Sequence, residues 1–285
     1  MCRCGERTRP AREGNLRNPA GSGSRQGTFL GARKQDNLLL WGEPMNQQAS
    51  RVQRSRLFAV LGTLGIAVAI IGFTKTFFLP LFAGTFSAHA VVYLHGAFLF
   101  GWVIFFATQS LWVQRRNVRL HRKMGWFGAG LVAGVVMSTL AVATLASRRT
   151  AAAGDLDLAS RELFVILIEM TVFSALVAAA FVWRRRPGIH KRLMLLALIA
   201  SLGPAWFRFR HYFPPVENPV FLYSVLLADS LVVIAAVVDV VRERRIHPVY
   251  VFAGTGMVLI HLAEVFAFGS SWFGALANLL AQPFH

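Results

Sequence analysis

Six ionisable residues stand inside long apolar stretches of this sequence, where charge is costly. They are Lys75, His95, Glu169, Asp229, His261 and Glu264. Placing such a group inside a membrane costs at least ~2.5–3.5 kcal/mol, so these residues usually face a polar interior and serve a function. At a rise of ~1.5 Å per residue they fall at a similar depth on five predicted helices, with Asp229 somewhat deeper. We therefore predict one shared polar cluster, in which Lys75 and the nearby Arg208 and Arg210 pair with the three acids.

Acids and histidines that titrate within a membrane are suited to proton relay, or to moving an ion or small molecule. His95 and His261 also lie at matching depth on different helices, as two axial haem ligands would, and Glu264 adds a carboxylate suited to a metal. A third interpretation is a polar network that only fixes helix packing. We predict a proton-, ion- or small-molecule-handling role, with haem or metal binding and a structural or interaction role as alternatives.

A second group of histidines, His121, His190 and His247, follows arginine-rich runs. Each stands where a basic turn leads into the next apolar stretch. At a helix N-terminus an imidazole tends to stay neutral, so it can act as a cap or as a ligand. The recurrence suggests three related helical hairpins preceded by one additional helix, and internal repeats are common in membrane transporters.

Seven apolar stretches can position these residues, because about 20 apolar residues cross ~30 Å of hydrocarbon. The predicted spans are 57–79, 89–112, 124–146, 162–183, 193–207, 218–240 and 248–268. The fifth is short and contains Pro204. The segment 271–283 is too short to span, and we expect it to lie at the interface or pack as a short helix. The fold class is an all-α, polytopic membrane helix bundle of about seven helices, in a single transmembrane domain over 45–285.

Loop charges predict the orientation of the bundle. Sixteen Lys and Arg residues lie before the first span and in alternate loops, against five on the opposite side. Since basic loops stay cytoplasmic, we place the N-terminus in the cytoplasm and the C-terminus outside. The basic loops would then contact anionic lipids of a cell (inner) membrane.

Composition excludes several classes of protein. The chain is 55% apolar and only 15% charged, with a formal net charge of +17, so it is too apolar for a soluble domain. Its basic residues sit in short runs between apolar stretches, which favours lipid over nucleic acid as the partner. The sequence has no phosphate-binding loop, no His-Glu-x-x-His and no Gly-x-Ser-x-Gly, so the residues favour a non-enzymatic role.

Residues 1–44 differ in composition from the rest of the chain. They are rich in Arg, Gly, Ser, Asn and Pro, which is typical of a disordered basic tail. Met45 opens a short polar stretch that leads into the first span, an ordinary beginning for a membrane protein. Two interpretations stay open: a genuine tail, or an over-extended reading frame whose true start is Met45.

Parts of the apolar region resemble a widespread family of uncharacterised bacterial multi-pass membrane proteins. The shared pattern is His95-Gly96, Trp102, Gln109, His121-Arg122 with Gly125, and His190-Lys191-Arg192-Leu193-Met194. The resemblance covers roughly residues 57–268 and implies a bacterial inner-membrane protein without implying an activity. The two histidine-containing fragments of the pattern are also faintly similar to haem-handling proteins of cytochrome oxidase assembly, and imply the haem alternative.

Overall fold

The computed structural model describes residues 45–284, and their side chains from Arg56 onward. The chain divides into Met1–Gln48 and Ala49–His285, and the helix bundle described below belongs to the second part. The predicted tail 1–44, with its two interpretations, lies outside the described residues.

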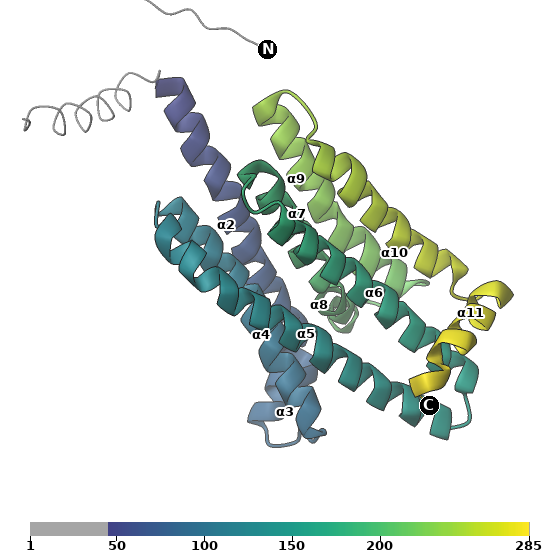
Figure 1. The fold of residues 1–285 in the computed structure, drawn as a ribbon. Helices are drawn as coiled ribbons and strands as arrows, with labels where there is room; N and C mark the ends of the chain where they lie inside the picture. The colour runs from purple at the N-terminus through teal and green to yellow at the C-terminus, as the bar shows by residue number, and fades with distance from the viewer. Residues whose placement is uncertain (1–44, 285) are drawn as a thin grey trace, which may run out of the picture. The chain divides into compact units, whose positions relative to one another are not determined.

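All regular structure in residues 45–284 is helical. The α-helices are α2 (Met45–Phe73), α3 (Leu79–Phe82), α4 (Ala90–Gln114), α5 (Val118–Ala152), α6 (Leu156–Val182), α7 (Pro187–Ser201), α8 (Gly203–Phe207), α9 (Ala228–Glu243), α10 (Thr255–Ala267) and α11 (Ser271–Ala281) (Figure 1). Three π-helical segments, Thr74–Phe78, Val220–Leu227 and Tyr250–Gly254, continue α2 or lead into α9 and α10. Single-turn 3-10 helices cover Arg208–His211 and Gln282–Phe284.

Seven helical stretches among the described residues are long and apolar enough to cross a membrane. The predicted all-α bundle with seven spans is therefore confirmed. The fifth span is longer than the predicted 193–207 and covers Pro187–His211, because α7 already begins at Pro187 and the turn Arg208–His211 continues the helix. The helix breaks at Leu202 and restarts as α8 with Pro204 in its first turn, where the missing N–H of proline costs little.

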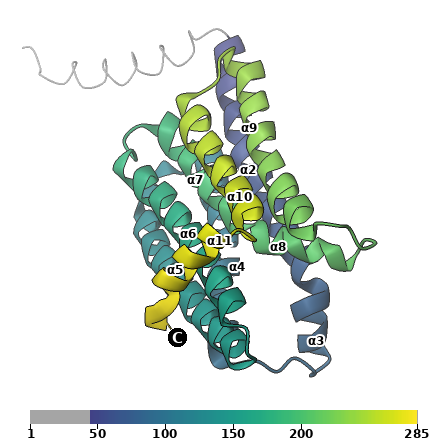
Figure 2. The ribbon, with the colours of Figure 1, turned by 90° about the vertical axis from the view of Figure 1, so that its right-hand side faces the viewer.

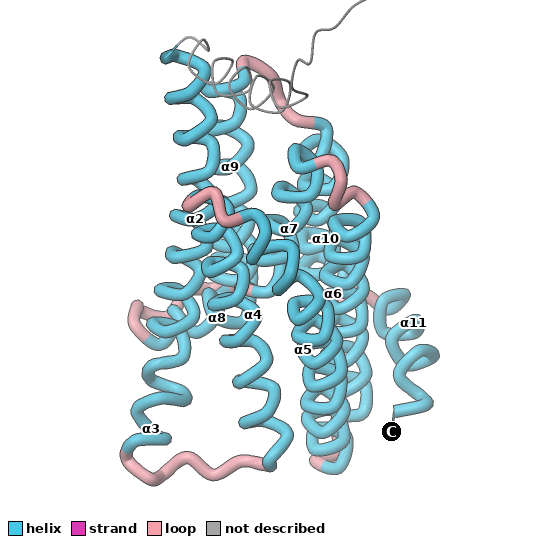
Figure 3. The backbone as a smooth tube through the Cα atoms, turned by 60° about the vertical axis from the view of Figure 1, so that its left-hand side comes forward, coloured by secondary structure: helices cyan, strands magenta, loops and turns pink. Residues whose placement is uncertain are grey.

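Short turns and capping side chains separate the helices. Asn117, Asp155 and Ser270 each accept a hydrogen bond from the backbone N–H three residues later, at the starts of α5, α6 and α11. Such caps satisfy N–H groups that have no partner inside the helix. Within residues 56–284, the successive spans run in alternating directions, joined by turns at the two ends of the bundle (Figure 3).

The core of the bundle forms around α7, which packs against α4, α6 and α9. Leu195, Leu196 and Ile199 are fully buried, and Figures 1 and 2 show α7 in the middle of its neighbours. The fifth span has the lowest mean hydropathy of the seven, 1.3, yet half of it is buried in the protein. Its side chains thus face protein more than lipid.

Trp102 ties α4 to this core. Its side chain is buried, its Nε1–H donates to Ser201 Oγ at 3.2 Å, and its ring meets Phe173 of α6 edge-on at 5.3 Å. The indole ring therefore contributes both apolar contact and a satisfied N–H group in the core.

The segment 271–283 folds mainly as α11, which packs on α6 (Figure 2). Arg161 of α6 donates to the carbonyl oxygens of Phe268 and Ser270, in the turn between α10 and α11. Gly274 leaves room for this guanidinium, because a Cβ there would lie 2.0 Å from Arg161 Nη2. The short helix is thus held to the bundle by a polar contact as well as by Phe273 on Phe164.

Candidate functional site

Four of the predicted residues meet between α6, α9 and α10, and we call them the acid–histidine cluster: Glu169, Asp229, His261 and Glu264. His261 of α10 lies at its centre. Its Nδ1 is 3.0 Å from both carboxylate oxygens of Asp229 on α9, and its Nε2 is 3.5 Å from Glu169 Oε1 on α6. Both imidazole nitrogens therefore face carboxylates supplied by other helices.

Glu264 extends the cluster by one turn of α10. Its side chain acts on that of Glu169, and two carboxylates this close repel each other unless one of them carries a proton. Glu264 is buried, and its Oε1 has no hydrogen-bond partner among the described residues. The cluster thus runs from Asp229 through His261 and Glu169 to Glu264, as a chain of groups that can each hold or release a proton.

Backbone irregularities occur in the two helices that carry most of this cluster. The π-helical segments Val220–Leu227 and Tyr250–Gly254 lead directly into α9 and α10. An extra residue per turn rotates the following helix relative to a regular one, and such segments are frequent at functional sites. Gly254 also allows close packing, since a Cβ there would lie 3.2 Å from Val232 of α9. These features bring Asp229 and His261 face to face.

The structure places the other two predicted residues elsewhere. Lys75 Nζ donates to the carbonyl oxygen of His211 at 2.8 Å and lies 4.4 Å from the centre of the Tyr212 ring. His95 Nδ1 is 3.4 Å from the hydroxyl oxygens of both Ser138 and Thr139 on α5. The expected pairing of Lys75 with the three acids does not occur, because Lys75 is held at the end of the fifth span.

The arrangement around His261 also bears on the haem alternative. An axial haem ligand needs a ring nitrogen that is open toward the iron. Nδ1 of His261 is held by Asp229 at 3.0 Å, whereas Nε2 faces Glu169 at 3.5 Å and has no hydrogen-bond partner among the described residues. Within the described part of the chain, no group of three or more His, Cys, Asp or Glu residues has the arrangement of a metal site.

Two of the three histidines after the basic turns lie together. The rings of His121 and His190 are 6.2 Å apart, and His190 Nδ1 lies 2.9 Å from the Ala180 carbonyl oxygen, to which it donates. His247 lies apart from that pair, where its Nδ1 accepts from the Val249 N–H at 3.2 Å. Partial burial, together with the nearby Arg192 guanidinium, lowers the pKa of His247 below its usual value, so this cap stays neutral.

Sequence reasoning missed a buried ionic group at the basic-turn end of the bundle, the Arg192 network. Arg192 is only 1% exposed. Its guanidinium pairs with Asp239, donates to Glu243 Oε1 at 2.9 Å and donates to the Gly188 carbonyl oxygen at 2.7 Å. The sequence did contain one indication of this network: Asp239 and Glu243 are two acids one helical turn apart at the end of the sixth span.

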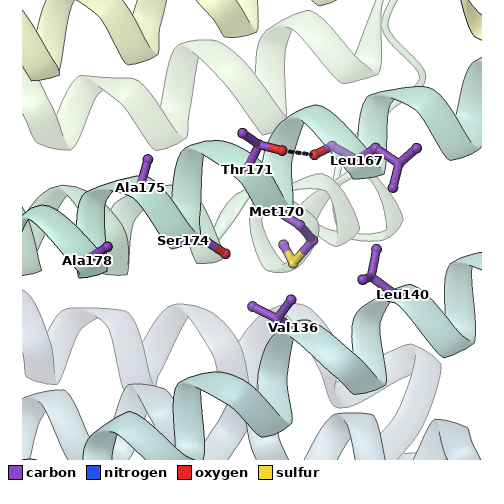
Figure 4. A pocket seen from close by; sticks show the side chains of 8 residues that line it. All are labelled: Val136, Leu140, Leu167, Met170, Thr171, Ser174, Ala175 and Ala178. Atoms are coloured by element: carbon purple, nitrogen blue, oxygen red, sulfur yellow. Dashed lines mark hydrogen bonds between the residues drawn. The ribbon is translucent and has the colours of Figure 1, made fainter. Parts of the chain in front are cut away.

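A shallow apolar groove of about 470 Å³ lies between α5 and α6. Figure 4 shows it lined by Val136 and Leu140 of α5 and by α6 side chains on either side of Thr171, whose hydroxyl donates to the Leu167 carbonyl oxygen. None of the acid–histidine cluster residues lines this groove. The polar chemistry of the cluster is therefore separate from it.

A search of protein-family models, of curated proteins and of solved structures gives no match to this chain. The candidate site is therefore interpreted from its own geometry. Seven spans with a buried acid–histidine cluster describe a multi-pass integral membrane protein.

Proposed function

We propose that this membrane protein takes up and passes on protons through the acid–histidine cluster, alone or coupled to a small solute. One observation carries the proposal: His261 has a carboxylate at each of its two nitrogens, from α9 on one side and α6 on the other. An imidazole can accept a proton at one nitrogen and release another from the second, which makes it the usual relay between acids.

The chemistry of the cluster follows from its charge. Three carboxyl groups share one imidazole, and ionising all three would leave negative charge unpaired in an apolar interior. A proton held between Glu169 and Glu264 removes one of these negative charges, and a proton on His261 offsets another. Transfer of this proton to His261 Nε2, with release from Nδ1 to Asp229, would move one proton along the cluster and leave the imidazole ready to turn or reset.

We place the protein in the cytoplasmic membrane of a bacterium, with its N-terminus inside. The excess of Lys and Arg in the alternate loops supports the orientation. The resemblance to bacterial multi-pass proteins supports the choice of membrane.

Proton flux into proteoliposomes tests the proposal directly. The full chain is reconstituted with a trapped pH-sensitive dye, and an imposed pH difference drives the flux. We expect the wild type to acidify the vesicles faster than empty vesicles do, and Glu169→Gln or His261→Gln to bring the rate back to that background. Glu162→Gln is the matched control, since Glu162 is also on α6 but outside the cluster.

Infrared spectroscopy supplies a second readout that does not depend on transport. A pH step should change the carbonyl stretch of a protonated carboxyl group in the wild type and in Glu162→Gln, and Glu264→Gln should lose that change. If the cluster variants keep both the flux and the infrared change of the wild type, the proposed relay is wrong.

A further inference from the structure

Basic side chains gather where the end of the first span meets the end of the fifth, and we call them the basic corner: Lys75, Arg208, Arg210 and His211. Close helix contact builds this corner. A Cβ on Gly72 would lie 2.3 Å from the Ala205 carbonyl oxygen, so only glycine lets α2 approach α8 this closely. The π-helical turn Thr74–Phe78 then follows directly and carries Lys75 toward the 3-10 turn Arg208–His211.

Aromatic rings and hydrogen bonds hold the cations in place. Arg208 Cζ lies 4.0 Å from the centre of the Phe73 ring, and its Nε donates to Thr76 Oγ1 at 3.2 Å. Arg210 Cζ lies 3.7 Å from the centre of the Phe207 ring. Cations held over rings in this way lose side-chain freedom before any ligand arrives, which lowers the entropic cost of binding one.

The basic corner has no acidic counterpart in the described part of the chain. None of the ion pairs within residues 56–284 involves Lys75, Arg208 or Arg210. Lys75 Nζ donates to the carbonyl oxygen of His211 at 2.8 Å, and Arg208, Arg210 and His211 lie in one 3-10 turn. At least three positive charges thus stand together at the end of a membrane helix bundle without a protein anion.

We propose that the basic corner binds a phosphate-type anion, either the headgroup of an anionic phospholipid or free inorganic phosphate. Guanidinium groups match the oxygens of phosphate in a bidentate geometry, and the Lys75 ammonium adds a point charge. Arg208, Arg210 and His211 end the fifth span, and Lys75 lies about two helical turns before the end of the first. This site is independent of the acid–histidine cluster and of the function proposed for it.

Two binding measurements on the full chain in a phosphate-free maltoside detergent distinguish the sources. Equilibrium dialysis measures inorganic phosphate, and native mass spectrometry measures retention of short-chain phosphatidylglycerol. We expect the wild type to bind at least one of them, and Lys75→Gln and Arg208→Gln to weaken that binding at least about tenfold. Arg149→Gln is the matched control, because it removes an exposed arginine at the same end of the bundle, outside the corner.

Arg208→Gln could disturb folding, since Arg208 bridges the first and fifth spans. Arg210→Gln is therefore measured beside it, because the Arg210 guanidinium lies over the Phe207 ring of its own span. Binding of phosphate only, or of the lipid only, supports the site and names its natural ligand. The proposal is overturned if the wild type binds neither anion, or if the Lys75 and Arg210 variants bind as tightly as Arg149→Gln.

Discussion

Replacing Arg192 by methionine should destabilise the bundle strongly, because the change leaves the buried Asp239 carboxylate without its cation. The side chains of Arg192, Asp239 and Glu243 are 2%, 6% and 14% exposed. Methionine has a similar length but cannot donate to either carboxylate or to the Gly188 carbonyl oxygen. The Asp239 carboxylate would then remain in the interior without its cation.

The magnitude follows from the burial of this network. Removing one partner of a buried ion pair costs about 3–5 kcal/mol, most of it from the charge left behind. That corresponds to a loss of about a hundredfold to a few thousandfold in the folding equilibrium. Removing an exposed, unpaired arginine should cost within about 0.5 kcal/mol.

Chemical unfolding of the protein in detergent micelles measures this difference. Arg245→Met is the control, because Arg245 is exposed and lies in the basic turn just after Glu243, outside the network. A double variant that also carries Asp239→Leu should recover most of the lost stability, since it removes the stranded charge. The reasoning is refuted if Arg192→Met costs no more than Arg245→Met.

Three further predictions concern single side chains. His247→Gln should reduce the loss of stability on acidification. The folded-state pKa of His247 lies below its unfolded value of about 6.5, so as the pH falls the unfolded chain takes up a proton first and is stabilised relative to the folded one. The free energy of unfolding at pH 7.5 and at pH 5.5 measures the difference. Trp102→Phe should cost about 1 kcal/mol for the lost hydrogen bond, against about 3–5 kcal/mol for Trp102→Ala, both read from unfolding curves. Gly274→Ala should displace Arg161 and expose α11 to protease, whereas Gly256→Ala, whose Cβ meets nothing within 4 Å, should leave cleavage unchanged.

The spans could be predicted from sequence because membrane thickness fixes their length and composition. Hydropathy alone predicts seven helices, and the structure has seven. The fifth span was the hardest to predict, because a proline such as Pro204 often ends a helix. In the structure Pro204 starts α8 within the same span. A proline alone does not show whether the helix after it continues in the same direction.

The depth of a residue along its helix could also be estimated from the sequence, but which helices lie next to each other could not. Glu169, Asp229, His261 and Glu264 were grouped by depth, and they meet because α6, α9 and α10 are adjacent. Lys75 was grouped with them for the same reason, yet it lies on a helix that faces the end of the fifth span. Which helices lie side by side depends on tertiary packing, and the pattern of residues in a single sequence does not reveal it.

Arg192 shows a different limit. It lies in a basic run that predicts orientation, and four neighbouring residues of that run carry the same charge. Position along α7 decides which one turns inward, and Asp239 on another helix decides that it stays there. Loop composition predicts the side of the membrane on which the loop lies, but it does not reveal that Arg192 is buried.

The central place of α7 has a consequence for how the protein is made. The fifth span has a mean hydropathy of 1.3, against 1.6 or more for the other six, so it partitions into lipid least readily on its own. During synthesis α4 and α6 precede it and can receive its apolar face, but the acids that neutralise Arg192 lie on α9, which emerges later. We therefore expect α7 to pack stably in the bundle only after α9 has been synthesised, because α9 supplies the acids that pair with Arg192.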